Sequence, residues 1–154
     1  MKGVAHYRAK RLADLIAVQI ARSQALRLEL AETVQAHERS VASYQSAWQE
    51  RLDHEAAWQQ ALHTQKGFDP LLTAALAEAV VDRLQAEAEA EAVLLERKRA
   101  EDQSRSNLRT ALKSEERSGE ALRVAVRQAA GERDHALELS LEQRTAWTWW
   151  RVQP

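Results

Sequence analysis

The sequence is poor in the residues that cross-link chains or interrupt helices. Its 154 residues include no cysteine, four glycines, two prolines and 5% aromatic residues. The lack of cysteine excludes disulfides, thiolate metal sites and cysteine nucleophiles, and it is typical of proteins from a reducing compartment, so we expect a cytoplasmic protein. The scarcity of glycine and proline leaves few positions at which a helix is expected to stop.

Long apolar runs are also absent. No stretch of about 18 apolar residues occurs, so we expect no membrane span. The first residues, MKGVAHYRAKRLADLIAVQIARSQ, begin basic, but Asp14, Gln19 and Arg22 divide their apolar part, and we do not expect a signal peptide. The formal net charge of −1 gives no general attraction to nucleic acid, and we expect none as a partner.

Helix-forming and charged residues are abundant. Alanine, glutamate, arginine, leucine and glutamine dominate, and 29% of the residues are charged, as in long helices and coiled coils. Apolar residues recur at heptad spacing from about residue 9 to residue 62. The predicted seam of this first helix has two columns, which are Ile16, Ser23, Leu30, His37, Tyr44, Arg51 and Trp58, and Ile20, Arg27, Val34, Val41, Trp48, Glu55 and Leu62.

The second half of the chain carries a similar pair of columns. They are Val80, Glu87, Leu94, Glu101, Leu108, Glu115 and Leu122, and Leu84, Glu91, Lys98, Arg105, Leu112, Gly119 and Val126. Polar residues occupy many of these positions, so the seam is expected to hold weakly, with His37 as a polar register residue.

One strong break divides the chain, in the stretch QKGFDPLLTAAL. Gly67 can stop a helix in a left-handed conformation, Asp69 can cap the next helix, and Pro70 suits its first position. Two helices separated by so short a turn are expected to run antiparallel. We therefore predict an all-α fold of one domain, residues 1–154. It is a long antiparallel two-helix coiled-coil hairpin with a helix at about 5–65, a turn at about 66–69, and a longer C-terminal helix at about 70–150.

Catalytic and metal-binding patterns are incomplete. The stretches HERSV and HEAAW each begin with His-Glu, but a zinc-protease helix needs a second histidine four residues on, and Val41 and Trp58 occupy those positions. A two-helix hairpin also offers no pocket that would shield a reaction from water. We expect a protein that is not an enzyme and that needs no metal or cofactor.

Charge and tryptophan are unevenly distributed. Residues 78–96 hold six acids and one arginine, whereas residues 97–127 hold nine basic residues and five acids. These blocks are either solvated faces or docking surfaces for oppositely charged partners. The stretch RTAWTWWRVQP places Trp147, Trp149 and Trp150 close together. They indicate a protein contact, packing within this chain or a dimer, or a membrane-surface anchor.

A cysteine-free chain with the N-terminal stretch YRAKRLADLIAVQIARSQ, a turn at KGFDPL and a second helix rich in Glu, Arg and Ala resembles a known family. This family comprises the central stalk proteins of bacterial type III secretion, which are FliJ-like and YscO-like and include the plant-pathogen HrpB-seven type. The resemblance covers the whole chain and rests on architecture. It implies a stalk at the base of the secretion apparatus. Its terminal end inserts in the hexameric secretion ATPase, its body reaches the export-gate protein, and some members bind translocator chaperones.

The resemblance implies two sets of binding residues, and the tryptophan-rich tail adds a third set from the residues alone. The ATPase end is Arg8, Lys10, Arg11, Leu12, Arg123, Arg127 and Leu137. The loop end is Phe68, Leu71 and Leu72, and the tail is Trp147, Trp149 and Trp150, which departs from the family pattern. Two alternatives remain open: a coiled-coil chaperone or adaptor, and a structural coiled coil that self-associates into a homo-oligomer.

Overall fold

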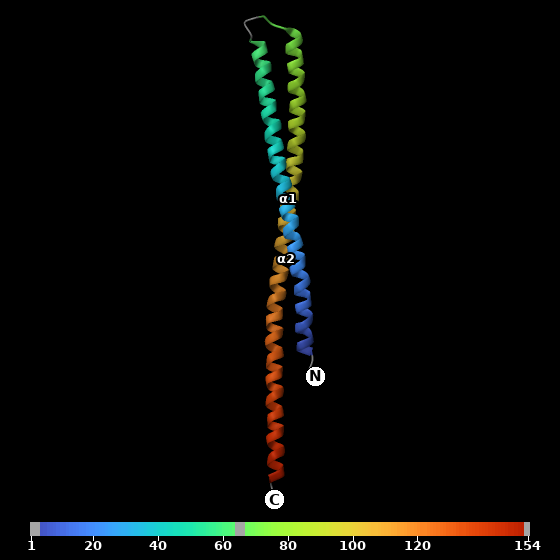
Figure 1. Cartoon of the computed structure of the whole chain (residues 1–154), viewed down its shortest axis with the longest axis vertical. Helices are drawn as coiled ribbons and strands as arrows, with labels where there is room; N and C mark the ends of the chain where they lie inside the picture. The colour runs from blue at the N-terminus through green and yellow to red at the C-terminus, as the bar shows by residue number, and fades with distance from the viewer. Residues whose placement is uncertain (1–3, 64–66, 153–154) are drawn as a thin grey trace. The chain divides into compact units, whose positions relative to one another are not determined.

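A computed structural model of the chain describes residues 4–63 and 67–152. It contains helix α1, Val4–Leu62, with 59 residues, and helix α2, Pro70–Val152, with 83 residues (Figure 1). No strand occurs in the described ranges, which confirms the all-α class. The chain divides into two compact units. Unit 1 comprises Met1–Ala25 and Arg109–Pro154, and unit 2 comprises Leu26–Leu108.

The start of α2 is fixed by the residues that the sequence singled out. The Asp69 carboxylate accepts hydrogen bonds from the backbone N–H groups of Leu71 at 3.0 Å and Leu72 at 3.2 Å, which satisfies two of the donors that a helix N-terminus leaves free. Pro70 is the first helical residue, and Gly67 has a φ of 111°, in the left-handed region. The predicted capping at this break is confirmed. The part of the predicted turn and first helix that falls on residues 64–66 lies outside the described residues.

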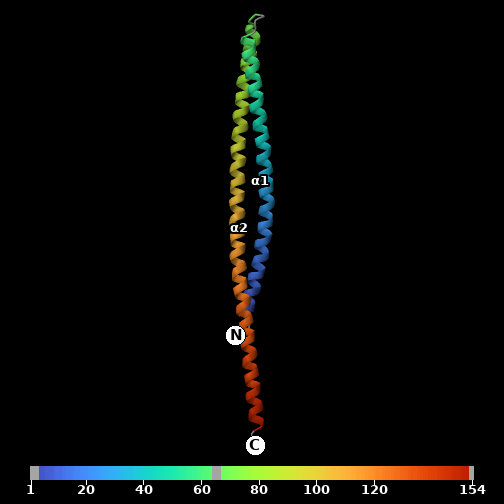
Figure 2. The same cartoon turned by 90° about the vertical axis from the view of Figure 1, so that its left-hand side faces the viewer.

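Unit 2 brings the last part of α1 beside the first part of α2. Residues 26–62 and 70–108 lie side by side in Figure 1 and in Figure 2. Interhelical contacts join Glu29 with Ser104, His37 with Glu101, Glu50 with Arg83, and Arg51 with Glu87. Partner numbers on α2 fall as residue numbers on α1 rise, so these contacts fix the pairing of the two segments.

Polar and apolar residues alternate along this seam. His37 contacts Glu101, and Arg51 contacts Glu87. On α1, Tyr44 lies midway between His37 and Arg51, seven residues from each. On α2, Leu94 lies midway between the two glutamates in the same way. All six residues are at least half-buried. A slip of one heptad would move each glutamate beside an apolar position, so the alternation favours one register over its neighbours.

In unit 1 the same kind of seam forms between the first part of α1 and residues 109–133 of α2. The Ser23 hydroxyl donates to the Glu115 carboxylate at 3.0 Å, and the Gln19 amide donates to the Ser114 hydroxyl at 3.0 Å. The most deeply buried side chains are small, with Ser23 and Ala125 each 2% exposed. The interior of this unit is therefore a narrow line of small and polar groups, with Ile16 and Leu122 half-buried beside it.

The predicted second column of each helix is only partly right: Val34, Val41 and Glu55 are half-buried, but other members are exposed. Trp48 and Leu62 on α1 and Leu84 and Val126 on α2 are exposed. The residues that lie inward instead precede them, and most are small. On α1 they include Gln19, Leu26, Thr33, Ser40, Ala47 and Ala61, and on α2 they include Leu76, Ala90, Ser104, Ala111, Ser118 and Ala125. Small side chains thus occupy much of the inner column in place of the larger residues predicted there.

Candidate functional site

The predicted ATPase end lies within unit 1. Arg8, Lys10 and Arg11 are exposed, and the Arg11 guanidinium lies 4.9 Å from the centre of the Tyr7 ring, a cation–π distance. Leu12 is half-buried at a seam position, so it packs inside the unit more than it faces outward. The start of α1 therefore offers cationic side chains beside exposed apolar ones, such as Tyr7 and Leu15.

The α2 residues of the same set are also exposed. Arg123 and Arg127 carry charge on the surface, and Leu137 is exposed nearer the C-terminus. The Arg133 guanidinium lies 3.4 Å from the His6 ring nitrogen. Among the described residues, this is the interhelical hydrogen-bond contact nearest to the C-terminal end of α2. All of the predicted ATPase-end residues thus belong to unit 1.

The two units carry opposite charge. Thirteen basic against eight acidic residues give unit 1 a formal charge of +5. Nine basic against fifteen acidic residues give unit 2 a formal charge of −6. The net charge of −1 conceals this separation, and it makes unit 1 the part that an acidic partner surface would attract.

The predicted loop end forms an apolar patch in unit 2. Phe68, Leu71 and Leu72 are all exposed, and Leu71 is 82% exposed. The Asp69 cap holds them in place because it fixes the first turn of α2. Exposed large apolar side chains in such a cluster are typical of a protein-binding surface.

The predicted tail is exposed throughout. Trp147 is 66% exposed and Trp150 is 86% exposed, and the Arg151 guanidinium lies 4.6 Å from the centre of a Trp147 ring. Trp147, Trp150, Ala146 and Arg151 line a shallow hollow on α2. One possibility for the tail was that these rings pack on α1 near residues 5–12. The structure does not show such packing, because all three rings are exposed.

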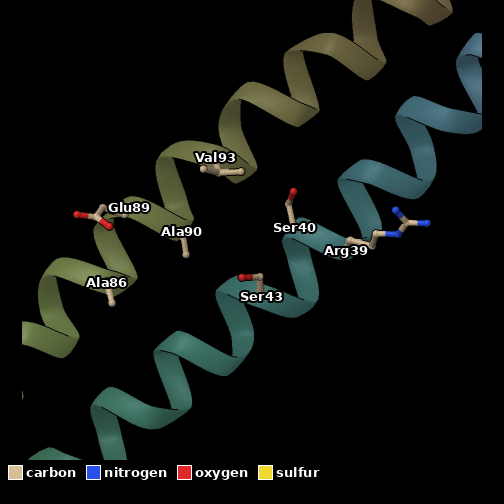
Figure 3. Close-up of a pocket in the computed structure, with 7 residues that line it drawn as sticks. All are labelled: Arg39, Ser40, Ser43, Ala86, Glu89, Ala90 and Val93. Atoms are coloured by element: carbon tan, nitrogen blue, oxygen red, sulfur yellow. The ribbon is translucent and has the colours of Figure 1, made fainter.

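A second hollow, in unit 2, was not predicted. Figure 3 shows Ser40 and Ser43 of α1 and Ala90 of α2 directed toward the space between the helices, and Glu89 directed away from it. The full lining is Arg39, Ser40, Ser43, Ala86, Glu89, Ala90 and Val93. The signal that could have found it is the run of Ala and Ser at matching positions on both helices, because short side chains leave the space unfilled.

Among the residues that the structure describes, Glu101 is the one deeply buried carboxylate, and its side chain is 8% exposed. It accepts from the His37 ring nitrogen at 2.6 Å and from the Arg105 guanidinium at 2.5 Å. A buried carboxylate held by two basic groups is a structural arrangement, and it leaves no free base for a reaction.

Two kinds of feature are absent from residues 4–63 and 67–152. No group of three or more His, Cys, Asp or Glu side chains in these ranges is arranged to hold a metal ion. Neither helix, as far as it is described, has an apolar stretch that could cross a membrane. Comparison of the chain with protein-family models, with curated proteins and with solved structures finds no match.

Proposed function

We propose that the chain is a non-enzymatic stalk of a bacterial type III secretion system. It inserts in the hexameric secretion ATPase, regulates it, and links it to the export gate in the cytoplasm at the base of the apparatus. The observation that carries the proposal is the separation of charge: a +5 unit containing the first residues of α1 and the last of α2, and a −6 unit containing the loop. A stalk that touches two different partners needs two chemically different ends.

The proposal includes a single antiparallel hairpin with a longer C-terminal helix. The pairing of Ser23 with Glu115 in unit 1 supports it, as does the pairing of His37 with Glu101 in unit 2. In both pairs a residue of the first α1 column meets a glutamate, and the two α1 residues and the two glutamates are each fourteen residues apart. One continuous register would accommodate both contacts.

The mechanism follows from asymmetry. A hairpin with unequal faces contacts six similar subunits unequally, so its binding energy favours the closed state of some subunits over others. Arg8, Arg123 and Arg127 supply charged contacts on the surface of unit 1, and the polar seam keeps the hairpin pliable because polar layers pair less tightly than apolar ones.

A coiled-coil adaptor or chaperone is the second candidate, favoured by the exposed loop patch. Phe68, Leu71 and Leu72 present apolar area on a capped helix start, which suits the apolar face of a client helix. In that function the ATPase is not a partner, and substitutions at the loop affect client binding alone.

The test compares two charge reversals of equal size in an ATPase-stimulation assay with the hexameric secretion ATPase of the same organism. One variant carries Arg8→Glu, Arg123→Glu and Arg127→Glu in unit 1. The matched control carries three substitutions at exposed residues of unit 2, Arg97→Glu, Lys98→Glu and Arg99→Glu.

The unit 1 variant is expected to lose binding and stimulation at least tenfold, while the control keeps most of both. Circular dichroism checks that both variants stay helical. Equal losses in the two variants, or a wild-type chain that neither binds nor stimulates the ATPase, would show that the stalk assignment is wrong.

A further inference from the structure

The seam face of α2 continues beyond its last contact with α1. Within unit 1, Ala125 is buried and Leu122 and Ala129 are half-buried on this face. The same alternation of three and four residues leads on through Glu132 and the half-buried Ala136 to Leu139, Gln143, Ala146 and Trp150. After Arg133 no described α1 residue bonds to α2, and no α1 segment lies beside the last turns of α2 in Figure 1 or Figure 2.

The uncovered face carries large aromatic rings near the end of α2. Trp150 lies on it and Trp147 lies at its edge, and both line the hollow with Ala146. Trp149 lies about 100° around the helix from Trp150 and so points off this face. A helix that presents its heptad face, with two large rings, to solvent lacks a partner helix.

We propose that residues 132–151 pair antiparallel with the same residues of a second copy, so that two chains join tail to tail. Two properties of the segment select this partner and this orientation. The first is charge: residues 132–142 carry four acids and one arginine, whereas residues 143–151 carry two arginines and no acid. Antiparallel pairing sets the acidic half of one copy beside the basic half of the other, and parallel pairing sets like beside like.

The second property is side-chain size. The basic half carries Trp147 and Trp150, while the acidic half carries Ala136 and Ser140 with Leu139 on or beside the same face. Antiparallel pairing places the large rings of each copy against the small residues of the other, which fills space evenly. Parallel pairing would press tryptophan against tryptophan at one end and leave a gap at the other.

The paired segment is short. The face from Ala136 to Trp150 spans fifteen residues, which is about 22 Å of helix. An interface of this length is expected to dissociate on dilution, so the monomer and the dimer exchange. The proposed dimer forms through the tail residues alone and does not require the secretion ATPase.

The first test measures molecular mass by light scattering and sedimentation of the full chain across a wide concentration range. The wild type is expected to pass from monomer to dimer as its concentration rises. The double variant Trp147→Ala/Trp150→Ala is expected to weaken the dimer at least tenfold. The matched control is Trp149→Ala, which keeps the dimer because its ring points off the face.

The second test fixes the orientation and exploits the absence of cysteine. Gln143→Cys, near the centre of the segment, is expected to cross-link two copies with a short bis-maleimide. Ala136→Cys lies on the same face but is about 20 Å or more from its counterpart in an antiparallel pair, so it is expected not to cross-link. A chain that stays monomeric at every concentration, a Trp149→Ala effect equal to that of the double variant, or cross-linking at residue 136 would each overturn the proposal.

Discussion

The polar contact between His37 and Glu101 in unit 2 offers a sharp test of how the seam works. The Glu101 side chain is 8% exposed and the His37 side chain is 25% exposed, and their atoms lie 2.6 Å apart. We consider three variants: His37→Leu, Glu101→Leu and the two substitutions together. The single variants leave one polar group without this partner, whereas the double variant replaces the polar layer with an apolar one.

The expected magnitude follows from burial. Removing one member of a fully buried charged pair costs about 3–5 kcal/mol. His37 is partly exposed, and Arg105 remains 2.5 Å from Glu101 after His37 is replaced, so we expect about 1–2 kcal/mol for His37→Leu. The double variant is expected to be at least as stable as the wild type, because two leucines pack without desolvating a carboxylate.

Urea denaturation followed by circular dichroism measures these differences. His63→Leu is the matched control, since His63 is exposed and its ring contacts the Gln59 carbonyl of its own helix at 2.8 Å. We expect it to change stability by about 0.5 kcal/mol or less. The reasoning is refuted if His37→Leu is no worse than this control, or if the double variant loses as much as the two single variants added together.

Three further predictions concern the helices themselves. Asp69→Ala removes the acceptor of two backbone N–H groups and is expected to cost about 1 kcal/mol in urea denaturation, whereas an unchanged midpoint would contradict the cap. Gly67→Ala forces a side chain into a φ of 111° and is expected to cost about 1–2 kcal/mol, although no atom lies within 4 Å of the added Cβ; a stabilising effect would argue against this conformation. Gly131→Ala meets nothing within 4 Å and is expected to raise stability by about 0.5–1 kcal/mol, which a drop in melting temperature would disprove.

Polar and apolar layers alternate along the seam. This alternation explains how two helices with little apolar core can favour one register over others. Glu87 and Glu101 stand fourteen residues apart on α2, and so do Arg51 and His37 on α1. Each contact adds little net stability, because the electrostatic attraction within a buried pair roughly offsets the free energy lost when the two groups leave water. What the contacts supply is a cost for the wrong register, since a displaced glutamate would be buried against leucine or tyrosine.

The exposure of most candidate binding residues was predictable from the sequence. Once one seam column of a helix is known, the helical period indicates which residues face away from the seam. The cationic residues Arg8, Arg123 and Arg127 and the apolar loop residues Phe68 and Leu71 all lie on the surface, as expected of binding residues. Leu12 was placed among them although it lies at a seam position. The hollow beside Ser43 and Ala90 was not predicted. Short side chains at matching positions are compatible with a hollow, but whether a space remains depends on how closely the two helices approach.

By itself the sequence determined the two helices, the capped break at Asp69 and Pro70, and one seam column on each helix. Those features depend on local propensity and on spacing along one chain. The tertiary structure decided which neighbouring column completes the seam. Trp48 and Ala47 stand only 100° apart around α1, and the periodicity of large residues favoured Trp48, but in the structure Ala47 is half-buried and Trp48 is exposed. That choice depends on both helices at once, because the distance between them sets the volume available to every residue in the seam.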